Sequence, residues 1–344
     1  MRSILALFAL LLTLTGCGEP PLYKQQAYVF GTLVDISVYG EDEAKAQRAV
    51  GQVLKDFDRL HEMLHAWKPG ALSRVNGLIE QGAGEVATSP GLVTLLQGAA
   101  RYSAQSDGLF NPAIGHLIQA WGFQADSFDN NVPPAPAEIA KWLKAAPAMS
   151  DLALQGHTVR SRNPAVRVDL GGYAKGYALD VAAAYLKSQG IHNALINIGG
   201  NIIALGKHGK RPWRVGIQHP RQAGAIALLD LHDGEAIGTS GDYQRYFEYR
   251  GRRYCHLIDP RTGQPVQGVQ AVTVLARGAQ AGVLSDVASK PLFISGAAGW
   301  RAMADKMGVR EAMFIDGNGR ISVTAALAQR LQWSPGVPAA TVVP

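Results

Sequence analysis

From Trp213 to Val274 the chain is built from short apolar runs separated by glycines and charged residues: RVGIQ, AIALLDL, YFEYR, RYCHLI and the beginning of AVTVLA. Runs of this length between turn residues are typical of β-strands. The connections are short and hairpin-like, whereas parallel strands need a long crossover. The segment therefore argues against a purely parallel sheet and predicts a fold of the α+β class, with mixed α/β content, a largely antiparallel sheet region and flanking helices.

Periodicity predicts the flanking elements. Helices are expected over Asp42–Ala66, Ser89–Ser106, Ala174–Gln189, Asp286–Ile294 and Trp300–Met307. Strands are expected over Tyr28–Tyr39, Val166–Leu170, Ala194–Ile198 and Ala312–Ile315. Ser89 caps its helix and Pro90 takes the first helical position. Residues 125–137, rich in Asp, Asn and Pro, are expected to form a surface loop.

The first residues predict export. Residues 1–16 combine Arg2 with an apolar run from Ile4 to Leu14, which is typical of a secretory signal peptide. Cys17 follows Leu14-Thr15-Gly16, and a cysteine at this place favours processing as a lipoprotein, with a lipid on Cys17 holding the chain to the membrane. An ordinary signal peptide with an incidental cysteine is the alternative. The prediction is a lipid-anchored protein on the periplasmic side of a bacterial membrane, with inner or outer membrane left open.

Charge and cysteine content limit the partners. The net charge of +6 fits an anionic ligand or membrane surface, but no basic run stands out, so nucleic acid is not expected as a partner. Cys17 and Cys255 are the two cysteines. With Cys17 assigned to lipid, Cys255 has no partner for a disulfide and is expected to be a small buried residue.

One short motif suggests a different chemistry. His61-Glu62-Met63-Leu64-His65 matches the H-E-x-x-H pattern of zinc proteases and lies on a predicted helix. The third ligand is missing, because the helix stops at Pro69-Gly70 and neither Glu80 nor Glu85 lies in a convincing second helix. A zinc protease is therefore a remote alternative to a solvated helix edge.

A glycine-rich segment joins a predicted strand to a predicted helix over residues 168–180, VDLGGYAKGYALD. Glycines at such a junction let backbone groups approach a ligand closely. Asp169 and Lys175 lie on the two sides of the turn, a hydrogen-bond acceptor and a cation suited to phosphate. The pattern is neither G-x-G-x-x-G nor a Walker loop.

Several motifs in the same order resemble the ApbE family, the FAD:protein FMN transferases. They are Phe30-Gly31-Thr32, Trp67-Lys68-Pro69 with Leu72-Ser73-Arg74-Val75-Asn76, Gly108-Leu109-Phe110-Asn111-Pro112 with Trp121-Gly122-Phe123, the segment 168–180, Asn197-Ile198-Gly199-Gly200-Asn201, Thr239-Ser240-Gly241-Asp242-Tyr243 and His256-Leu257-Ile258-Asp259-Pro260-Arg261-Thr262-Gly263. The resemblance implies an ApbE-like domain over residues 28–330, between a tether at 17–27 and a loose Pro-rich tail at 331–344.

The resemblance implies a reaction and its participants. FMN is transferred from FAD to a Thr or Ser hydroxyl of an acceptor protein, and AMP is released with the help of Mg²⁺. Acceptors are expected to be flavin-carrying subunits of membrane redox complexes. Two alternatives stay open: a lipoprotein that binds FAD without catalysis, and a pyrophosphatase that converts FAD to FMN and AMP.

The resemblance also assigns residues to roles. His256 is the expected general base, and the expected FAD contacts are Phe30, Trp67, Leu109, Phe110, Asn111, Asp169 and Lys175. The metal would lie on the carbonyl of Gly172 and the carboxylate of Asp286. The family segment D-A-x-x-T reads Asp286-Val287-Ala288-Ser289-Lys290 in this chain, so Lys290 stands at the Thr position. An ammonium cannot ligate Mg²⁺, which leaves Ser289 as the substitute ligand, or a Lys290 that points away or contacts phosphate.

Overall fold

A nine-stranded sheet, counted over the residues that the computed structural model describes (20–125, 127–128 and 131–344), forms the centre of the molecule. In spatial order its strands are β1 (Leu22–Val29), β2 (Thr32–Tyr39), β6 (Ala194–Ile198), β7 (Asn201–Leu205), β10 (Glu235–Gly241), β15 (Val269–Arg277), β16 (Glu311–Asp316), β17 (Ile321–Thr324) and β19 (Thr341–Val343). Neighbours pair antiparallel, with the exception of β17 and β19. The predicted mixed α/β class with a largely antiparallel sheet is therefore confirmed.

The sheet begins with a hairpin at its edge. Phe30 and Gly31 form the turn between β1 and β2, with φ of 56° and 70°. The single strand predicted over Tyr28–Tyr39 is thus split, because a positive φ at two successive residues reverses the chain. β1 begins at Leu22, so the sheet starts inside the segment that we assigned to the tether. Cys17 and the expected signal peptide lie outside the described residues.

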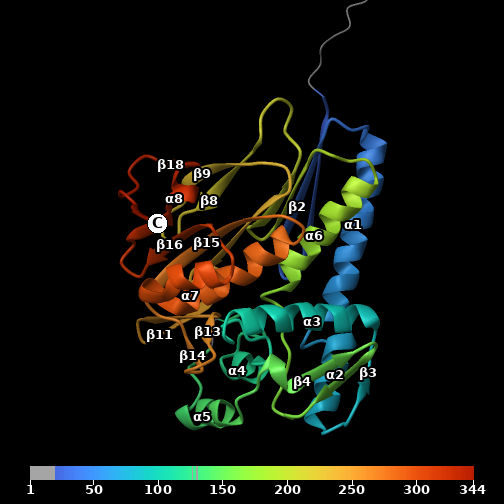
Figure 1. Ribbon diagram of the computed structural model, residues 1–344, viewed down its shortest axis with the longest axis vertical. Helices are drawn as coiled ribbons and strands as arrows, with labels where there is room; N and C mark the ends of the chain where they lie inside the picture. Colours follow the sequence, from blue (N-terminus) through green and yellow to red (C-terminus); the bar gives the residue numbers. More distant parts are fainter. Residues whose placement is uncertain (1–19, 126, 129–130) are drawn as a thin grey trace, which may run out of the picture.

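Three helices cover one face of the sheet: α1 (Glu43–Leu64), α6 (Ala174–Ser188) and α7 (Ala281–Lys306) (Figure 1). Val50 and Phe57 of α1 pack with Ile36 of β2 in one apolar cluster. The two helices predicted over Asp286–Ile294 and Trp300–Met307 correspond to the two parts of α7. α7 starts at Ala281 and is interrupted at Gly296, where φ is 65°.

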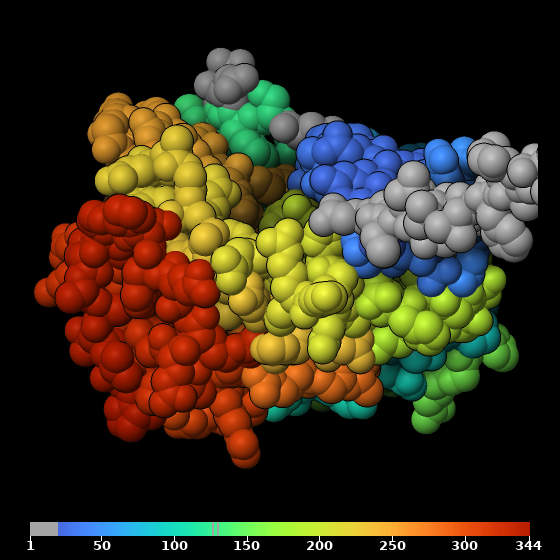
Figure 2. All heavy atoms as spheres, turned by 90° about the horizontal axis from the view of Figure 1, so that it is seen from above, coloured from blue at the N-terminus to red at the C-terminus, as the bar shows by residue number. Residues whose placement is uncertain are grey.

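The opposite face of the sheet is covered by a small second sheet of β8 (Trp213–Gln218), β9 (Ala225–Leu231) and β18 (Leu331–Trp333). The short helix α8 (Ala325–Ala328) precedes β18. Residues expected in a loose tail form β18 and β19 instead, since pairing with β9 and β17 satisfies their backbone groups. Seen from above, these C-terminal segments and the N-terminal hairpin lie at opposite ends of the molecule (Figure 2).

A smaller layer lies beyond α6 and α7, at the lower end of Figure 1. It holds α2 (Ala71–Glu80), α3 (Pro90–Gln105), α4 (Gly115–Ala120), α5 (Pro136–Ala145), a 3₁₀ turn (Met149–Asp151), and strands β3 (Val86–Ala87), β4 (Leu152–Gln155) and β5 (Thr158–Ser161). The predicted cap of α3 is confirmed, because Oγ of Ser89 accepts from the Leu92 amide at 3.2 Å. α2, α4 and α5 were not predicted.

Two β-hairpins connect β10 with β15: β11 (Tyr246–Tyr249) with β12 (Arg252–Cys255), and β13 (Ile258–Asp259) with β14 (Gln264–Pro265). The strand predicted over Val166–Leu170 was wrong, since this segment forms only an isolated bridge between Arg167 and Ile114. Among the described residues, no helix is both long and apolar enough to cross a membrane.

Candidate active site

The segment before α6 is held by one buried side chain. Nδ2 of Asn76 donates to the Val168 carbonyl and Oδ1 accepts from the Val168 amide, both at 2.8 Å. Asn76 is fully buried, so these bonds are shielded from water. The amide side chain therefore takes the place of a neighbouring strand and fixes the position of Asp169.

Asp169 in turn orients the indole of Trp67. Oδ2 of Asp169 accepts from Nε1 of Trp67 at 2.9 Å, and Oδ1 accepts from the Gly171 amide at 2.7 Å. The guanidinium of Arg167 lies over the Trp67 ring, 4.4 Å from its centroid. Arg167 is itself paired with Glu80, at 2.7 Å. Two predicted FAD contacts are thus brought together, while the part played by Arg167 was not predicted.

The zinc-protease alternative lacks a ligand set. Glu80, considered as a third ligand, lies at the end of α2 and is shared between Arg167 and Nε2 of His116, the latter at 3.2 Å. Nδ1 of His65 accepts from the amides of Trp67 and Lys68 at 3.1 and 3.0 Å. In the part of the chain that the structure describes, no three His, Cys, Asp or Glu side chains gather to hold a metal ion.

Asp286 lies inside α7, facing the first turn of α6. Its Oδ2 accepts from the Gly176 amide at 2.9 Å, and its side chain is fully buried. Nζ of Lys290, one helical turn later, donates to the Asp286 carbonyl at 2.6 Å and forms an ion pair with Oδ1. Ser289 is buried, and its hydroxyl donates to the same carbonyl at 2.7 Å and bonds to Ser240. The predicted carboxylate ligand, Asp286, is therefore already paired with a cation, the ammonium of Lys290.

Gly172, the predicted carbonyl ligand, lies against this pair. A Cβ built on Gly172 would be 3.2 Å from Cε of Lys290 and 3.3 Å from Cε2 of Phe110. Leu109 is buried in the large core cluster, next to Phe110. Asn111 uses its side chain locally, donating to the Pro147 carbonyl at 2.9 Å and accepting from the Ala113 amide at 3.1 Å. The structure thus brings Gly172, Phe110 and Lys290 together and gives Asn111 a structural role.

His256 follows β12 and bonds to the backbone of Arg245. The Arg245 carbonyl accepts from the His256 amide at 3.0 Å and lies 3.1 Å from Nδ1 of the ring. Because a carbonyl oxygen can only accept, Nδ1 carries the proton and Nε2 keeps its lone pair. Burial, and then the positive charge of Arg245, lower the pKa of His256 to about 3. The imidazole is therefore neutral at physiological pH.

Three positively charged side chains act electrostatically on His256. Lys175 and Lys290 act on its pKa in the same direction as Arg245. Burial also lowers the pKa of Lys175, where Asp286 opposes the effect of Lys290 and Arg245. Three cations therefore act on the neutral imidazole of His256, and one of them, Lys290, lies against Gly172 in the turn before α6, an arrangement suited to a polyanionic ligand.

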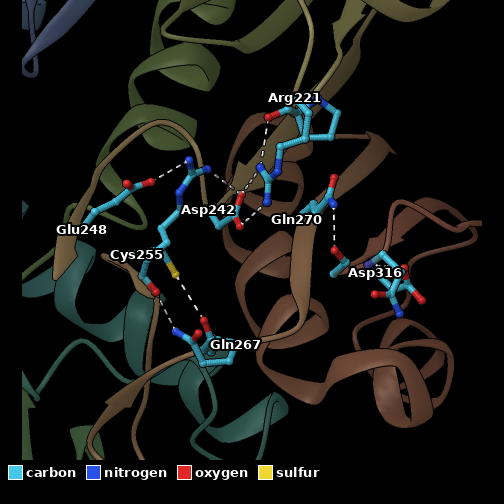
Figure 3. A network of polar contacts seen from close by, with 12 residues as sticks. Arg221, Asp242, Glu248, Cys255, Gln267, Gln270 and Asp316 are labelled. Atoms are coloured by element: carbon cyan, nitrogen blue, oxygen red, sulfur yellow. Dashed lines mark hydrogen bonds and ion pairs between the residues drawn. The ribbon is translucent and has the colours of Figure 1, made fainter. Parts of the chain in front are cut away.

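A polar network supports the segment that carries Arg245. Arg221 binds Asp242 through two hydrogen bonds of 2.7 and 2.6 Å, and Figure 3 shows these two side chains facing each other. Cys255 is buried in the same region, with Sγ 3.6 Å from the Val266 carbonyl, and burial raises its pKa to about 12. Cys255 is therefore an inert buried residue, as expected. Arg221 and Arg245 were not predicted, although Asp242 belongs to a recognised motif.

Phe30, the remaining predicted FAD contact, lies at the hairpin turn beside the end of α1. Its ring centroid is 5.8 Å from that of Phe57 and 5.7 Å from that of His61. The ring of His61 contacts His65 edge-on at 5.2 Å. These rings form an aromatic wall that leads from the hairpin to the segment of Trp67.

Comparison with known proteins gives a consistent result. The model of the ApbE family matches residues 30–314. The chain is 43% identical to a FAD:protein FMN transferase of Rhodobacter capsulatus over 91% of its own length, but it spans only 59% of that relative. A FAD:protein FMN transferase of Vibrio cholerae is 33% identical over 80% of this chain and 83% of the relative. The crystal structure of the ApbE protein of Thermotoga maritima superposes with a TM-score of 0.81 and 29% identity, over 90% of this chain and 99% of that one. The chain belongs to the ApbE family.

Proposed function

We propose that this protein transfers FMN from FAD to a Thr or Ser hydroxyl of an acceptor protein and releases AMP. The proposal is carried by the hydrogen bond from Nδ1 of His256 to the Arg245 carbonyl, with Lys290 against Gly172 and the charges of Lys175, Arg245 and Lys290 acting on the imidazole. A pyrophosphate is the part of FAD that needs cations, and an incoming hydroxyl needs a base. The names of the relatives in Rhodobacter capsulatus and Vibrio cholerae agree with this activity.

His256 has the tautomer that a base requires. Nδ1 donates to the Arg245 carbonyl, which leaves Nε2 to take the proton of the attacking hydroxyl. The hydroxyl oxygen then bonds to the FMN phosphorus, and the bond from this phosphorus to the bridging oxygen breaks. AMP leaves with that oxygen and its electron pair. Lys175, Arg245 and the N–H groups at the start of α6 offset the negative charge on the phosphate oxygens.

The aromatic wall supplies the flavin side of the site. Trp67 offers an indole surface for stacking on the isoalloxazine ring, and Asp169 and Arg167 hold the indole in place. Phe30, Leu109, Phe110 and Asn111 complete the set that the family resemblance assigns to FAD. Leu109 and Asn111 act by supporting the segment, since one is buried and the other binds the backbone.

Mg²⁺ is the cofactor that the resemblance implies, on the Gly172 carbonyl and the Asp286 carboxylate. Oxygen ligands of this kind suit the ion. The Asp286 oxygens, however, already accept from Lys290 and Gly176, and the Ser289 hydroxyl is buried in two hydrogen bonds. The residues present therefore do not fit a divalent ion in this arrangement.

We also propose where the protein is located and which proteins receive FMN, and both proposals rest on the sequence. The signal-like residues 1–16 and Cys17 support lipid anchoring on the periplasmic side of a membrane. Flavin-carrying subunits of membrane redox complexes are the acceptors that suit such a place. A shared membrane raises the effective concentration of one partner near the other.

The test is covalent labelling of an acceptor. The full-length chain in detergent is incubated with FAD and a recombinant flavin-carrying domain that has its acceptor Thr, and flavin fluorescence is read on a denaturing gel. We expect a fluorescent acceptor and one AMP per label, both lost with His256→Gln and with an acceptor whose Thr is changed to Ala. FMN and AMP without label would mean a pyrophosphatase instead. Bound FAD that stays intact would mean a flavin-binding lipoprotein.

A further inference from the structure

Lys290 occupies the position from which a divalent cation would act. It follows Asp286 by one helical turn, and its ammonium bonds to both the carbonyl and the carboxylate of that residue. A metal ion on Asp286 would have to displace a cation that belongs to the same helix. A tethered group has a high effective concentration, so the exchange is unfavourable.

The ion pair of Asp286 and Lys290 is also largely buried. The Asp286 side chain is fully buried and that of Lys290 is 15% exposed. Removing the ammonium would leave a buried carboxylate that keeps the hydrogen bond from the Gly176 amide but loses its ion pair, which is costly. Ser289 cannot compensate by turning toward an ion, because its hydroxyl is buried between the Asp286 carbonyl and Ser240.

The same ammonium faces the expected position of the pyrophosphate. The end of the Lys290 side chain lies against Gly172, in the glycine turn before α6. Its charge acts on Lys175 and His256, so it lies among the groups assigned to the phosphates. An ammonium has three donors. Two are used by Asp286, and within the described part of the chain the third has no partner.

The geometry points to Lys290 as a built-in replacement for the divalent cation: its ammonium binds the FAD pyrophosphate directly, so FAD binding and cleavage do not require Mg²⁺. The inference rests on the proposed function. The balance of the transfer is unchanged, with the hydroxyl proton passing to His256, a new bond from oxygen to the FMN phosphorus, and AMP leaving with the bridging oxygen. Lys290 supplies the positive charge that an ion would bring to the phosphate oxygens.

The test compares wild type, Lys290→Thr and Lys290→Met in EDTA and with added Mg²⁺, using the full-length chain in detergent. We expect wild type to bind FAD and label the acceptor equally in both conditions. Lys290→Met should lose on the order of 100-fold in rate, the cost typical of deleting one preorganised donor. Lys290→Thr should be inactive in EDTA and be rescued by Mg²⁺, because a hydroxyl is a ligand for the ion. Lys187→Met is the control, since Lys187 lies far along α6 in a half-exposed pair with Asp233.

Two further measurements do not depend on catalysis. Mn²⁺, a paramagnetic probe for oxygen ligands, should bind Lys290→Thr but not wild type in an electron paramagnetic resonance titration. Quenching of flavin fluorescence should show FAD bound to wild type in EDTA. Wild-type labelling that is abolished by EDTA, or Mn²⁺ bound as tightly by wild type as by Lys290→Thr, would overturn the inference and leave the transferase intact. If no variant labels the acceptor in any condition, the proposed transferase activity is wrong. The measurements of FAD and Mn²⁺ binding would still show whether Lys290 takes the place of the divalent ion.

Discussion

Nε1 of Trp67 donates to Oδ2 of Asp169 across 2.9 Å, although 102 positions separate the two residues in the chain. The bond joins the end of the α1 segment to the glycine turn before α6. A hydrogen bond to a charged acceptor is stronger than one between neutral groups. The indole thus has a fixed orientation before any flavin arrives, and less entropy is lost on binding.

Trp67→Phe tests this preorganisation. Phenylalanine keeps an aromatic surface but cannot donate to Asp169, so stacking and orientation are separated. We expect FAD affinity to fall by about tenfold, the cost of one hydrogen bond to a charged group. Titration of FAD with quenching of its fluorescence measures the change. Asp169→Asn should produce a similar loss with the indole intact, and unchanged affinity in both variants would show that the bond does not position the flavin.

The pH dependence of the rate tests the state of His256. Its pKa of about 3 lies below the ordinary value of 6.5, so the imidazole stays neutral between these values. We expect kcat/KM, which reports the free enzyme, to show no acid-side loss near 6.5. His256→Gln should lower kcat by roughly 100-fold to 10,000-fold at all pH values, because a general base is missing. A clear inflection near 6.5 in the wild-type profile would contradict the shift.

The same lowered pKa has a consequence for stability. Between pH 3 and 6.5 the unfolded chain binds a proton at His256 that the folded chain does not bind. Stability therefore rises with pH through this window. His256→Gln should remove this part of the pH dependence, which chemical denaturation at several pH values would measure.

Local signals in the sequence predicted many elements of the fold. The cap at Ser89 with Pro90 indicated the start of α3, and short apolar runs between turn residues predicted the strands β8 and β9. Periodicity could not predict the segment of Val166 to Leu170. Its alternating buried residues look like a strand, but the backbone pairs with the side chain of Asn76, which lies 92 positions away. Such a contact depends on tertiary structure alone.

The site was predictable in part, for a similar reason. Motifs pointed to Asp286 and His256 and drew attention to Lys290, but the direction of the Lys290 side chain stayed open until the structure placed its ammonium on Asp286. Arg245 had no signal of its own, because its role comes from a carbonyl that binds His256 and a charge near Lys175. Both depend on how the hairpin after β10 folds back on the sheet.

The partly buried carboxylate of Asp180 binds the first turn of α7, and its contribution to stability can be tested through pH. Its carboxylate accepts from the amides of Gly282 and Val283 at 2.8 and 2.9 Å, yet burial raises its pKa to about 6. Between pH 3.8, the ordinary pKa of an aspartate carboxyl, and pH 6, the folded state therefore binds more protons than the unfolded state. Stability falls as pH rises through this window, by about 2 to 3 kcal/mol at most. Unfolding of wild type and Asp180→Asn at several pH values should show this slope in wild type alone.

Gly176 and Gly282 mark the closest approach of α6 and α7. A Cβ on Gly176 would lie 2.4 Å from the Gly282 carbonyl oxygen and 2.8 Å from Cβ of Asp286. The reciprocal Cβ on Gly282 would lie 2.5 Å from the Gly176 carbonyl oxygen. Both obstacles are backbone atoms, so the helices must separate. We expect Gly176→Ala to cost about 1 to 3 kcal/mol of stability, as overpacking does.

Moving α6 away from α7 should also disturb the candidate active site, because the Gly176 amide binds Asp286, which is paired with Lys290. Gly176→Ala should therefore weaken FAD binding, measured by fluorescence, as well as lower the midpoint of thermal unfolding. Gly51→Ala is the matched control: Gly51 is also helical, in α1, and a Cβ there meets no atom within 4 Å. That variant should gain about 0.5 to 1 kcal/mol, because alanine favours a helix over glycine, and should bind FAD as wild type does. If Gly176→Ala resembles Gly51→Ala in both measurements, α6 and α7 do not depend on this close contact.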